Sequence, residues 1–265
     1  DRAIIKRTEK EAKEHSLLQN LDQTFQKIDE LPFDFERRRM SVIVKDDEGT
    51  VSMVTKGALE EMLTISSRVE YHGEITPLTD AIRAEILAEV GQLNKQGLRV
   101  LGIGYKTDIQ EGYSYTVKDE KDMILTGYLA FLDPPKPSAA PAIKALLEHG
   151  VKTKILTGDN EKVTQAICEK VGLDIEHILL GVDIDQMSDE QLAEVVESVT
   201  VFAKLSPDQK ARIILQLKRN GHGVGYMGDG INDAPSMKVA DVGISVDTAV
   251  DIAKETADVI LLDKD

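Results

Sequence analysis

Two carboxylates and a carboxamide stand close together after an apolar run in the last third of the chain. The run ends at Met227, and the residues that follow are Gly228, Asp229, Gly230, Ile231, Asn232 and Asp233. Glycine lets the backbone approach a ligand closely, and carboxylate oxygens suit a hard cation such as Mg²⁺. Crowded carboxylates raise each other's pKa unless a cation intervenes. The pattern predicts a Mg²⁺ site at the end of a strand, with Asp229 as a ligand.

Two further polar groups suit a phosphate. Thr157, Gly158 and Asp159 follow an apolar run, so a hydroxyl and backbone N–H groups could meet a phosphoryl oxygen there. The alternative is an ordinary turn, in which Asp159 or Asn160 caps the next helix. Lys210 lies one turn into a predicted helix, where its ammonium either neutralises a phosphate or is simply solvated. With Mg²⁺, these groups supply what phosphoryl transfer needs, namely positioning and charge neutralisation.

The first half of the chain carries a different set of side chains. Aromatic and basic residues lie next to three predicted strands: Phe33, Phe35, Arg37, Arg38, Arg39, Lys56 and Arg99. An aromatic ring can stack on a base, and Lys and Arg bind phosphates. Each basic residue taken singly also fits a solvated surface charge. The chain has no Gly-x4-Gly-Lys-Ser/Thr sequence, which excludes a P-loop.

Composition restricts the class of protein. The 265 residues are 42% hydrophobic and 30% charged, which is typical of a globular chain, and the net charge of −15 argues against a nucleic-acid partner. The single cysteine, Cys168, cannot form an intrachain disulfide, and we expect it to be a small buried residue. The charged start does not resemble a signal peptide, and the longest apolar run, residues 123–132, is too short to span a bilayer.

The pattern of elements changes near residue 131. Before it we predict antiparallel strands at 41–44 and 51–55 joined by a hairpin, a further strand at 99–103, and helices at 59–65 and 81–93. Asp133-Pro134-Pro135-Lys136-Pro137 cannot continue a helix or a central strand, so it predicts a hinge. Residues 1–131 and 132–265 are therefore the predicted domains.

After the hinge, strands and helices alternate. Strands are predicted at 152–157, 200–203, 224–227, 242–246 and 259–262, and helices at 139–149, 160–171, 188–199 and 206–220. Apolar strands that alternate with helices predict a parallel sheet covered on both faces. Ligands of such sheets bind beyond the carboxyl ends of the strands, where Thr157 and Asp229 fall.

Four motifs, which follow one another along the chain in the family's order, resemble those of the P-type ion-pumping ATPases. Met227 to Pro235 is similar to the family's GDGxNDxP motif, Thr157-Gly158-Asp159 to its TGD motif, and Lys56-Gly57-Ala58 to its KGA motif. Asp133-Pro134-Pro135 resembles its interdomain hinge. The runs 33–42 and 243–253 resemble the bacterial magnesium-importing pumps. Calcium and proton pumps, which share the general motifs, are the alternatives within the family.

The resemblance implies a fold and a set of roles. Residues 132–265 would form a phosphorylation (P) domain, a haloacid-dehalogenase-like doubly wound parallel sheet of the α/β class. Residues 1–131 would form an α+β nucleotide-binding (N) domain with an antiparallel sheet. The catalytic set would be Thr157, Gly158, Asp159, Lys210, Asn232 and Asp233, with Mg²⁺ at Asp229 and Asp233. The ATP-binding set would be Phe35, Arg37, Lys56, Gly57, Arg99, Asp133 and Lys204, with Asp1-Arg2-Ala3 facing the adenine.

The resemblance also implies partners, a location and one departure. The partners would be ATP, Mg²⁺, and the actuator and transmembrane domains of a pump, on the cytoplasmic side of a bacterial membrane. The family's DKTGT sequence, whose Asp accepts the γ-phosphate, is absent here, so we expect the chain alone to be inactive. A regulatory module that binds ATP or Mg²⁺ without turnover is the alternative. A soluble phosphatase ranks last, because no strand precedes Asp1 as a nucleophile would require.

Overall fold

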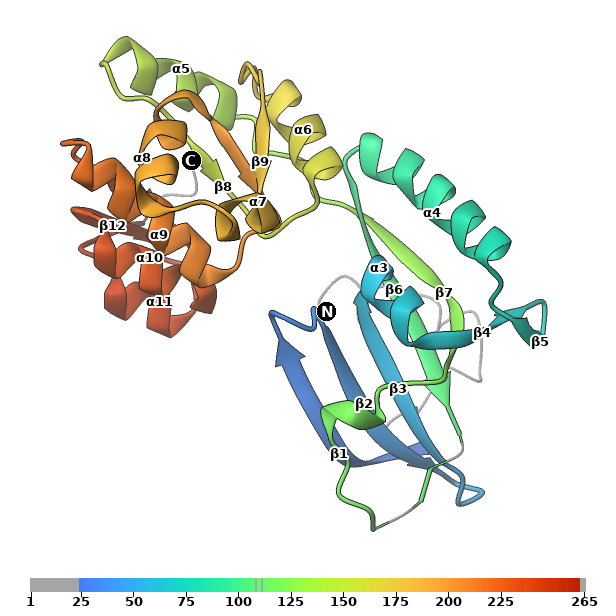
Figure 1. Cartoon of the computed structure of the whole chain (residues 1–265). Helices are drawn as coiled ribbons and strands as arrows, with labels where there is room; N and C mark the ends of the chain where they lie inside the picture. Colours follow the sequence, from blue (N-terminus) through green and yellow to red (C-terminus); the bar gives the residue numbers. More distant parts are fainter. Residues whose placement is uncertain (1–23, 108, 111, 263–265) are drawn as a thin grey trace. The chain divides into compact units, whose positions relative to one another are not determined.

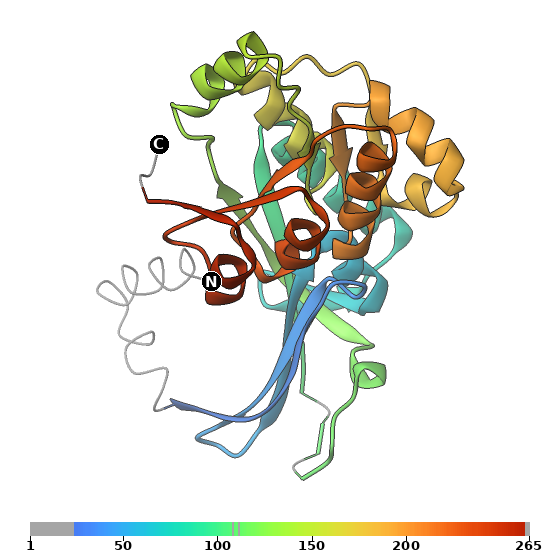
Figure 2. The same ribbon diagram turned by 90° about the vertical axis from the view of Figure 1, so that its left-hand side faces the viewer.

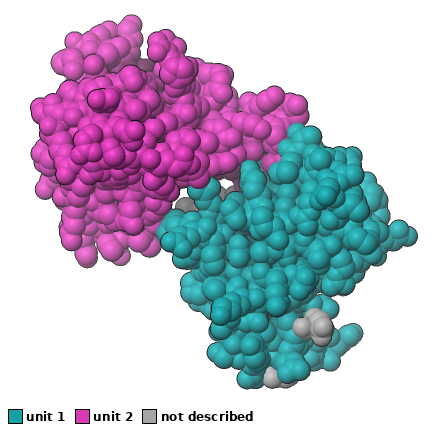
Figure 3. Space-filling model, in the orientation of Figure 1, with its two compact units in different colours: residues 1–89, 100–130 teal, residues 90–99, 131–265 magenta. Residues whose placement is uncertain are grey.

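The computed structural model describes residues 24–107, 109–110 and 112–262 (Figure 1). The chain divides into two compact units (Figure 3). Unit 1 comprises residues 1–89 and 100–130, and unit 2 comprises residues 90–99 and 131–265. Within the described ranges, no helix combines the length and the apolar character that crossing a bilayer demands.

Unit 1 is built on a seven-stranded sheet with the order β1-β2-β3-β6-β7-β4-β5. The strands are β1 (Phe25–Asp34), β2 (Arg39–Asp46), β3 (Val51–Ala58), β4 (Ser66–Tyr71), β5 (Glu74–Pro77), β6 (Leu98–Lys106) and β7 (Met123–Leu132). The pairs β1–β2, β2–β3, β3–β6 and β4–β5 are antiparallel, and β4–β7 is parallel. Of these pairs, the antiparallel hairpin of β2 and β3 was predicted. The predicted hairpin joins β2 to β3, and Asp46 Oδ1 accepts hydrogen bonds there from the backbone of Glu48 and Thr50.

The β1–β2–β3 sheet of unit 1 has two unlike faces. One is buried, and its apolar cluster includes Leu31, Ile43, Met53 and Met123. The helix α3 (Leu59–Ile65) coincides with its predicted range, and Leu59 and Met62 approach the sheet at Gly102. The helix α4 (Asp80–Lys95), predicted at 81–93, contributes residues to both units. A 3-10 turn, η2 (Val117–Asp119), precedes β7.

Unit 2 contains parallel strands, but they form two separate sheets. Their orders are β8-β10-β9 and β11-β12-β13. The strands are β8 (Ile155–Leu156), β9 (Ile178–Leu180), β10 (Val201–Ala203), β11 (Gly225–Met227), β12 (Val242–Val246) and β13 (Val259–Leu261). The prediction of parallel strands is confirmed, and the single sheet is replaced by two of three strands each. Within the described residues, β8 and β11 each have one unpaired edge.

Helices alternate with these strands. They are α5 (Ala139–Glu148), α6 (Glu161–Lys170), α7 (Gly181–Asp185), α8 (Asp189–Ser198), α9 (Pro207–Arg219), η3 (Ile231–Asp233), α10 (Ala234–Val239) and α11 (Asp251–Thr256). The capping boxes predicted for α8 and α9 are present, with Ser188 and Gln191 in one and Ser206 and Gln209 in the other. In Figure 2, α10 and α11 appear in red beside the strands of the second sheet.

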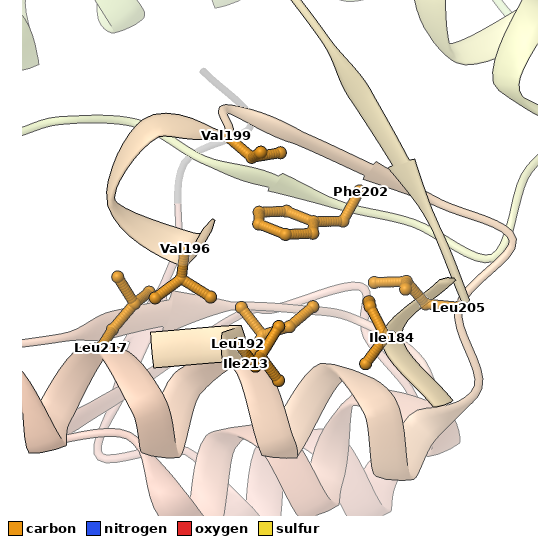
Figure 4. Packing of buried hydrophobic residues seen from close by; sticks show 8 residues of the cluster. All are labelled: Ile184, Leu192, Val196, Val199, Phe202, Leu205, Ile213 and Leu217. Carbon is orange, nitrogen blue, oxygen red and sulfur yellow. The ribbon is translucent and has the colours of Figure 1, made fainter. Parts of the chain in front are cut away.

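Two apolar clusters hold unit 2 together. The first gathers around Phe202 of β10 and joins α7, α8 and α9 (Figure 4). The second joins Ile214 of α9 and Tyr226 of β11 to α10 and α11. Leu156 and Val224 pack against both clusters, so the two sheets share part of their core. Cys168 is 2% exposed, as expected, and burial raises the pKa of its thiol.

The helix α5 differs from the rest of unit 2. It is rich in alanine and leucine, yet it has no buried residue, and Leu146 and Leu147 are exposed. Its C-terminal turn is as predicted, because Gly150 adopts a left-handed conformation with φ of +79°.

Candidate functional site

The turn after β8 is fixed by backbone hydrogen bonds to the segment after β10. The N–H of Thr157 donates to Phe202, the N–H of Leu205 donates to the carbonyl of Thr157, and the N–H of Lys204 donates to Asp159. Inside the turn, the N–H of Asp159 donates to Thr157 Oγ1 over 3.1 Å. The turn therefore places the Thr157 hydroxyl at the carboxyl end of the first sheet of unit 2.

Asn160, rather than Asp159, caps the helix α6. Its Oδ1 accepts a hydrogen bond of 2.9 Å from the N–H of Lys162. Because Asn160 is the N-cap, the carboxylate of Asp159 can bind another partner. Added at Gly158, a Cβ would lie 3.4 Å from the Leu205 carbonyl, an ordinary contact distance.

Asp159 forms an ion pair with Arg99 inside unit 2. Arg99 Nη2 lies 2.7 Å from Asp159 Oδ2, and Arg99 Nη1 lies 3.5 Å from Asp133 Oδ2. The structure thus brings together three residues that the sequence placed in a catalytic turn, a nucleotide pocket and a hinge. All three side chains retain contact with solvent, so these ion pairs contribute little to stability.

The loop after β11 is organised around Asp233. Lys210 Nζ lies 2.9 Å from Asp233 Oδ1, and the Tyr226 hydroxyl donates to the same oxygen over 2.7 Å. The other oxygen, Oδ2, accepts from the N–H groups of Asp229 at 3.3 Å and Gly230 at 3.1 Å. Four donors therefore use the four lone-pair positions of one carboxylate.

This network determines the charge of its members. Burial alone would raise the pKa of Asp233, but hydrogen bonds from Tyr226 and Lys210 outweigh that effect and hold it below its ordinary value. Burial, followed by the hydrogen bond to Asp233, raises the pKa of Tyr226. At neutral pH, Asp233 is thus an ionised acceptor and Tyr226 a neutral donor.

Gly228 is required by the fold of this loop. Added to it, a Cβ would lie 2.4 Å from Asp233 Cβ, a distance at which atoms overlap. The loop continues into η3, which contains Asn232, and then into α10 with Pro235 in its first turn. The carbonyl of Asp229 accepts from the N–H of Val250 over 3.1 Å, while the Asp229 side chain faces solvent.

The oxygen ligands at the end of β11 fit a magnesium ion that is bound by only one or two side chains of the protein. The described residues contain no group of three or more His, Cys, Asp or Glu side chains able to hold a metal. Mg²⁺ commonly uses one or two carboxylates and completes its shell with water and phosphate oxygens. The exposed carboxylate of Asp229 suits this mode better than Asp233, whose oxygens already accept four hydrogen bonds.

In unit 1, Lys56 lies on the less buried face of the sheet. The strand β3 alternates strictly between buried and half-buried residues, and Lys56 belongs to the half-buried set. Its cross-strand neighbours are Met40 on β2 and Ile103 on β6. Burial lowers the pKa of Lys56. Lys56 therefore lies beside the apolar side chains of Met40 and Ile103. This surface was not predicted from the sequence, although the period-two alternation of β2, β3 and β6 would have revealed it.

Gly57 faces the opposite side of the sheet from Lys56. Added to Gly57, a Cβ would lie 2.5 Å from Arg39 Cβ and 2.7 Å from the Arg38 carbonyl. The glycine is therefore needed where β3 passes the turn between β1 and β2. In the KGA motif, the lysine and the glycine serve different faces of one strand.

Two aromatic rings sit at the turn between β1 and β2. Phe33 and Phe35 form an edge-to-face pair with centroids 4.9 Å apart, and both are exposed. Arg37, predicted to contact ATP, lies in the same turn, where its guanidinium is bound to the buried carboxylate of Glu120. Glu120 was not predicted from the sequence, because a lone glutamate 83 residues from its partner leaves no local pattern.

Lys204 has a left-handed backbone with φ of +53°, and its Nζ lies 3.3 Å from Glu161 Oε2. Glu161 also lines a cavity of about 300 Å³ at the edge strand β9, whose other lining residues are Gln165, Ile175, Glu176, His177, Ile178 and Leu180. No residue predicted for the site lines that cavity. The residues Asp1-Arg2-Ala3 lie outside the described part of the chain.

The chain is similar to several known proteins. Over 265 residues the chain is 50% identical to "Magnesium-transporting ATPase, P-type 1" of Escherichia coli (strain K12), covering 100% of this chain and 29% of that protein. It is 50% identical over 258 residues to the protein of that name from Salmonella typhimurium (strain 14028s / SGSC 2262), covering 94% and 28%. Over 247 residues it is 36% identical to "Calcium-transporting ATPase" of Bacillus subtilis (strain 168), covering 92% and 28%.

The chain therefore spans under a third of the length of these relatives. Residues 1–138 match the family model described as "P-type ATPase, cytoplasmic domain N". That match covers more than half of the sequence and begins at its first residue. The chain belongs to the P-type ATPase family.

Proposed function

We propose that this chain is the ATP-binding and phosphorylation portion of a magnesium-transporting P-type ATPase. The observation that carries the proposal is the Lys210–Asp233 ion pair at the end of β11, in the same unit as the Thr157 turn at the end of β8. Both belong to parallel strands, whose carboxyl ends are where such sheets bind ligands. The proposed ion is magnesium, because the relatives named for magnesium are 50% identical and the one named for calcium is 36% identical.

In this proposal, unit 2 is the core of a haloacid-dehalogenase-like P domain spanning residues 132–265. Support comes from the unpaired edges of β8 and β11 and from the core that their sheets share. A parallel strand from outside the present sequence would fit between these edges and join both sheets into one. Such a strand would deliver an aspartate nucleophile beside Thr157 and Asp229, the role that the absent DKTGT sequence would serve.

The residues of unit 2 would then divide the work of phosphoryl transfer. The Thr157 hydroxyl and the Lys210 ammonium hold the phosphoryl oxygens, and Lys210 is kept in place by Asp233. Asp229 binds Mg²⁺, with Asn232 beside it, and Asp233 holds the loop through its four donors. The bound Mg²⁺ supplies positive charge that neutralises the phosphate oxygens.

Unit 1 would be the N domain, residues 1–131, and would bind the base of ATP. The exposed rings of Phe33 and Phe35 offer stacking surfaces, and Lys56 stands on a half-buried apolar face. Arg99, Asp133 and Lys204 remain proposed contacts for the ribose and phosphates. The protein would work on the cytoplasmic side of a bacterial membrane with the actuator and transmembrane domains of the whole pump.

A calorimetric titration with the non-hydrolysable ATP analogue AMP-PCP tests the nucleotide site. Lys56→Ala should weaken binding about tenfold, which corresponds to about 1.4 kcal/mol, because it removes the ammonium from the apolar face. Lys27→Ala, which removes an exposed lysine of β1, is the matched control and should bind normally. Equal affinities in the two variants would contradict the assigned pocket.

A magnesium titration followed by NMR tests the site in unit 2. We expect Mg²⁺ to shift the signals of the loop 228–233 in the unmodified chain and not in Asp229→Ala. Asp251→Ala removes an exposed carboxylate of α11 and should respond like the unmodified chain. Identical shifts in Asp229→Ala and the unmodified chain would count against Asp229 as the ligand.

A further inference from the structure

Glu120 is a buried carboxylate with three close donors in unit 1. Its side chain is 0% exposed, and its Oε2 lies 2.5 Å from Arg37 Nη1 and 2.8 Å from Arg39 Nε. Its Oε1 accepts a hydrogen bond of 2.8 Å from the Ser41 hydroxyl. Charge-assisted hydrogen bonds of this length are among the strong polar contacts of a protein interior.

A chain of hydroxyl groups extends this contact across the sheet. Ser41 Oγ and Thr55 Oγ1 are 2.7 Å apart, and both residues are 0% exposed. An ionised carboxylate only accepts, so Ser41 gives its single hydrogen to Glu120 and Thr55 must donate to Ser41. Burial would raise the pKa of Glu120, but the bonds from Arg37, Ser41 and Arg39 outweigh it and lower the pKa.

The two arginines belong to the turn that carries the aromatic pair. Arg37 also donates from Nη2 to the carbonyl of Pro32 over 2.9 Å, so its guanidinium joins the end of β1 to Glu120. Asp34 closes the turn by accepting the N–H groups of Glu36 and Arg37. Phe33 and Phe35 lie on either side of Asp34, so the orientation of their rings depends on this turn.

The turn is also tied to the strand that carries Lys56. Arg39 pairs with Gly57 across β2 and β3, and Met40 pairs with Lys56. Alternate residues of a strand face opposite sides of a sheet. The hydrogen bonds from Glu120 through Ser41 therefore end at Thr55, on the face opposite the side chain of the next residue, Lys56. One carboxylate from a distant segment thereby connects the aromatic turn to the lysine end of β3.

We propose that Glu120 is a positioning residue of the nucleotide pocket, which holds the Phe33–Phe35 turn against the Lys56 end of β3 through Arg37 and Arg39. The inference rests on the proposed nucleotide site of unit 1. Glu120 itself lies on the face of the sheet opposite Lys56, so it would act on the pocket through Arg37 and Arg39. Buried support of this kind fixes binding groups before a ligand arrives, so less order has to be imposed on binding.

The sign of the effect separates positioning from simple electrostatics. Glu120→Gln removes one negative charge, and on charge alone an anionic nucleotide should bind more tightly. Positioning predicts the opposite, because the arginines lose their charged anchor and the turn becomes free to move. A role confined to stability predicts an unchanged affinity below the melting temperature.

The test is a titration of the unmodified chain and Glu120→Gln with AMP-PCP, well below the melting temperature of both. We expect at least fivefold weaker binding by the variant, together with altered NMR signals of the Phe33 and Phe35 rings before ligand is added. Glu48→Gln makes the same charge change in the exposed turn between β2 and β3 and should leave both readouts unchanged. Arg39→Lys, which keeps the charge but loses Nε, should weaken binding in the same direction and replaces Glu120→Gln if that variant does not fold.

The outcomes distinguish this inference from the proposed function. If the unmodified chain does not bind AMP-PCP, both the proposed nucleotide site and the positioning role of Glu120 are contradicted. If the unmodified chain binds and Glu120→Gln or Arg39→Lys binds equally well or more tightly, only the positioning role is overturned.

Discussion

Asp233 shows how much a single carboxylate can organise. Its four donors come from α9, β11 and its own loop, so it fixes the position of the Lys210 ammonium and shapes the backbone around Asp229. The residue types at this site and the motif they form can be read directly from the sequence. The sequence did not reveal that Tyr226, which was interpreted only as part of an apolar strand, contributes its hydroxyl.

Removing that hydroxyl should be measurable. Tyr226→Phe keeps the ring but deprives a buried, charged acceptor of one donor, and we expect the free energy of unfolding to fall by about 2 kcal/mol. Urea denaturation followed by circular dichroism measures the change. Tyr71→Phe alters a tyrosine that is 71% exposed and serves as the control. A loss as small as that of the control would mean that the Tyr226–Asp233 bond contributes nothing net.

Glu120 makes stability depend on acidity. Its ordinary pKa is 4.5, and the folded chain holds the pKa lower, so the unfolded chain takes up the proton first as the pH falls. The stabilisation is complete above about pH 4.5 and is lost as the pH drops through the folded-state pKa. In Glu120→Gln this loss should be absent. The melting temperature of the variant, measured from pH 6 to pH 3, should therefore fall less steeply with decreasing pH than that of the unmodified chain. An equal decrease of the melting temperature in both proteins would show that Glu120 does not cause this dependence.

Among the elements, those with local signals were predicted best. Ser206, Pro207 and Gln209 define the start of α9, and the helix begins at Pro207. The strand β8 is only two residues long, although the apolar run predicted 152–157, because strand length depends on a neighbour to pair with. The strands β1, β4, β5, β7 and β9 were not predicted. The sequences of β1, β4 and β5 mix polar and apolar residues without a clear period, and β9 is only three residues long. The run that forms β7 was considered only for its length as a membrane span.

At Gly57, where β3 passes the turn between β1 and β2, there is no room for a side chain. Gly57→Ala should lower the free energy of unfolding by about 3 kcal/mol, because its Cβ would overlap the Arg39 Cβ and the Arg38 carbonyl, which are backbone or close to it. Thermal unfolding measures this loss. Gly225→Ala, whose Cβ would meet nothing nearer than 3.8 Å, is the control in another strand. Equal melting temperatures would mean that the turn can shift without cost.

For the whole molecule, the two sheets of unit 2 pose the main question. If a strand from a longer form of the protein fills the space between β8 and β11, the backbone of both strands gains partners. Hydrogen exchange at residues 155–156 and 225–227 should then be slower in the longer form than in the present chain. Residues 178–180, in the edge strand β9, should exchange equally in both. Equal exchange at β8 and β11 would contradict the single-sheet proposal.

The order of the motifs and the type of most elements were visible as local patterns of sequence. The division of unit 2 into two sheets was not, because apolar strands look alike whether or not they pair with one another. The pairing of Arg99 with Asp159 was equally hidden, since the two residues are 60 positions apart.

The apolar surface of α5 has a consequence for the chain in solution. Leu146 and Leu147 expose hydrocarbon, which favours self-association, while a net charge of −15 makes the copies repel each other. Salt screens that repulsion at separations beyond about 10 Å at 0.1 M, but does not weaken the attraction between apolar surfaces. The chain should therefore stay monomeric in dilute buffer and aggregate progressively as salt is added, a trend that light scattering would record and that Leu147→Glu should diminish.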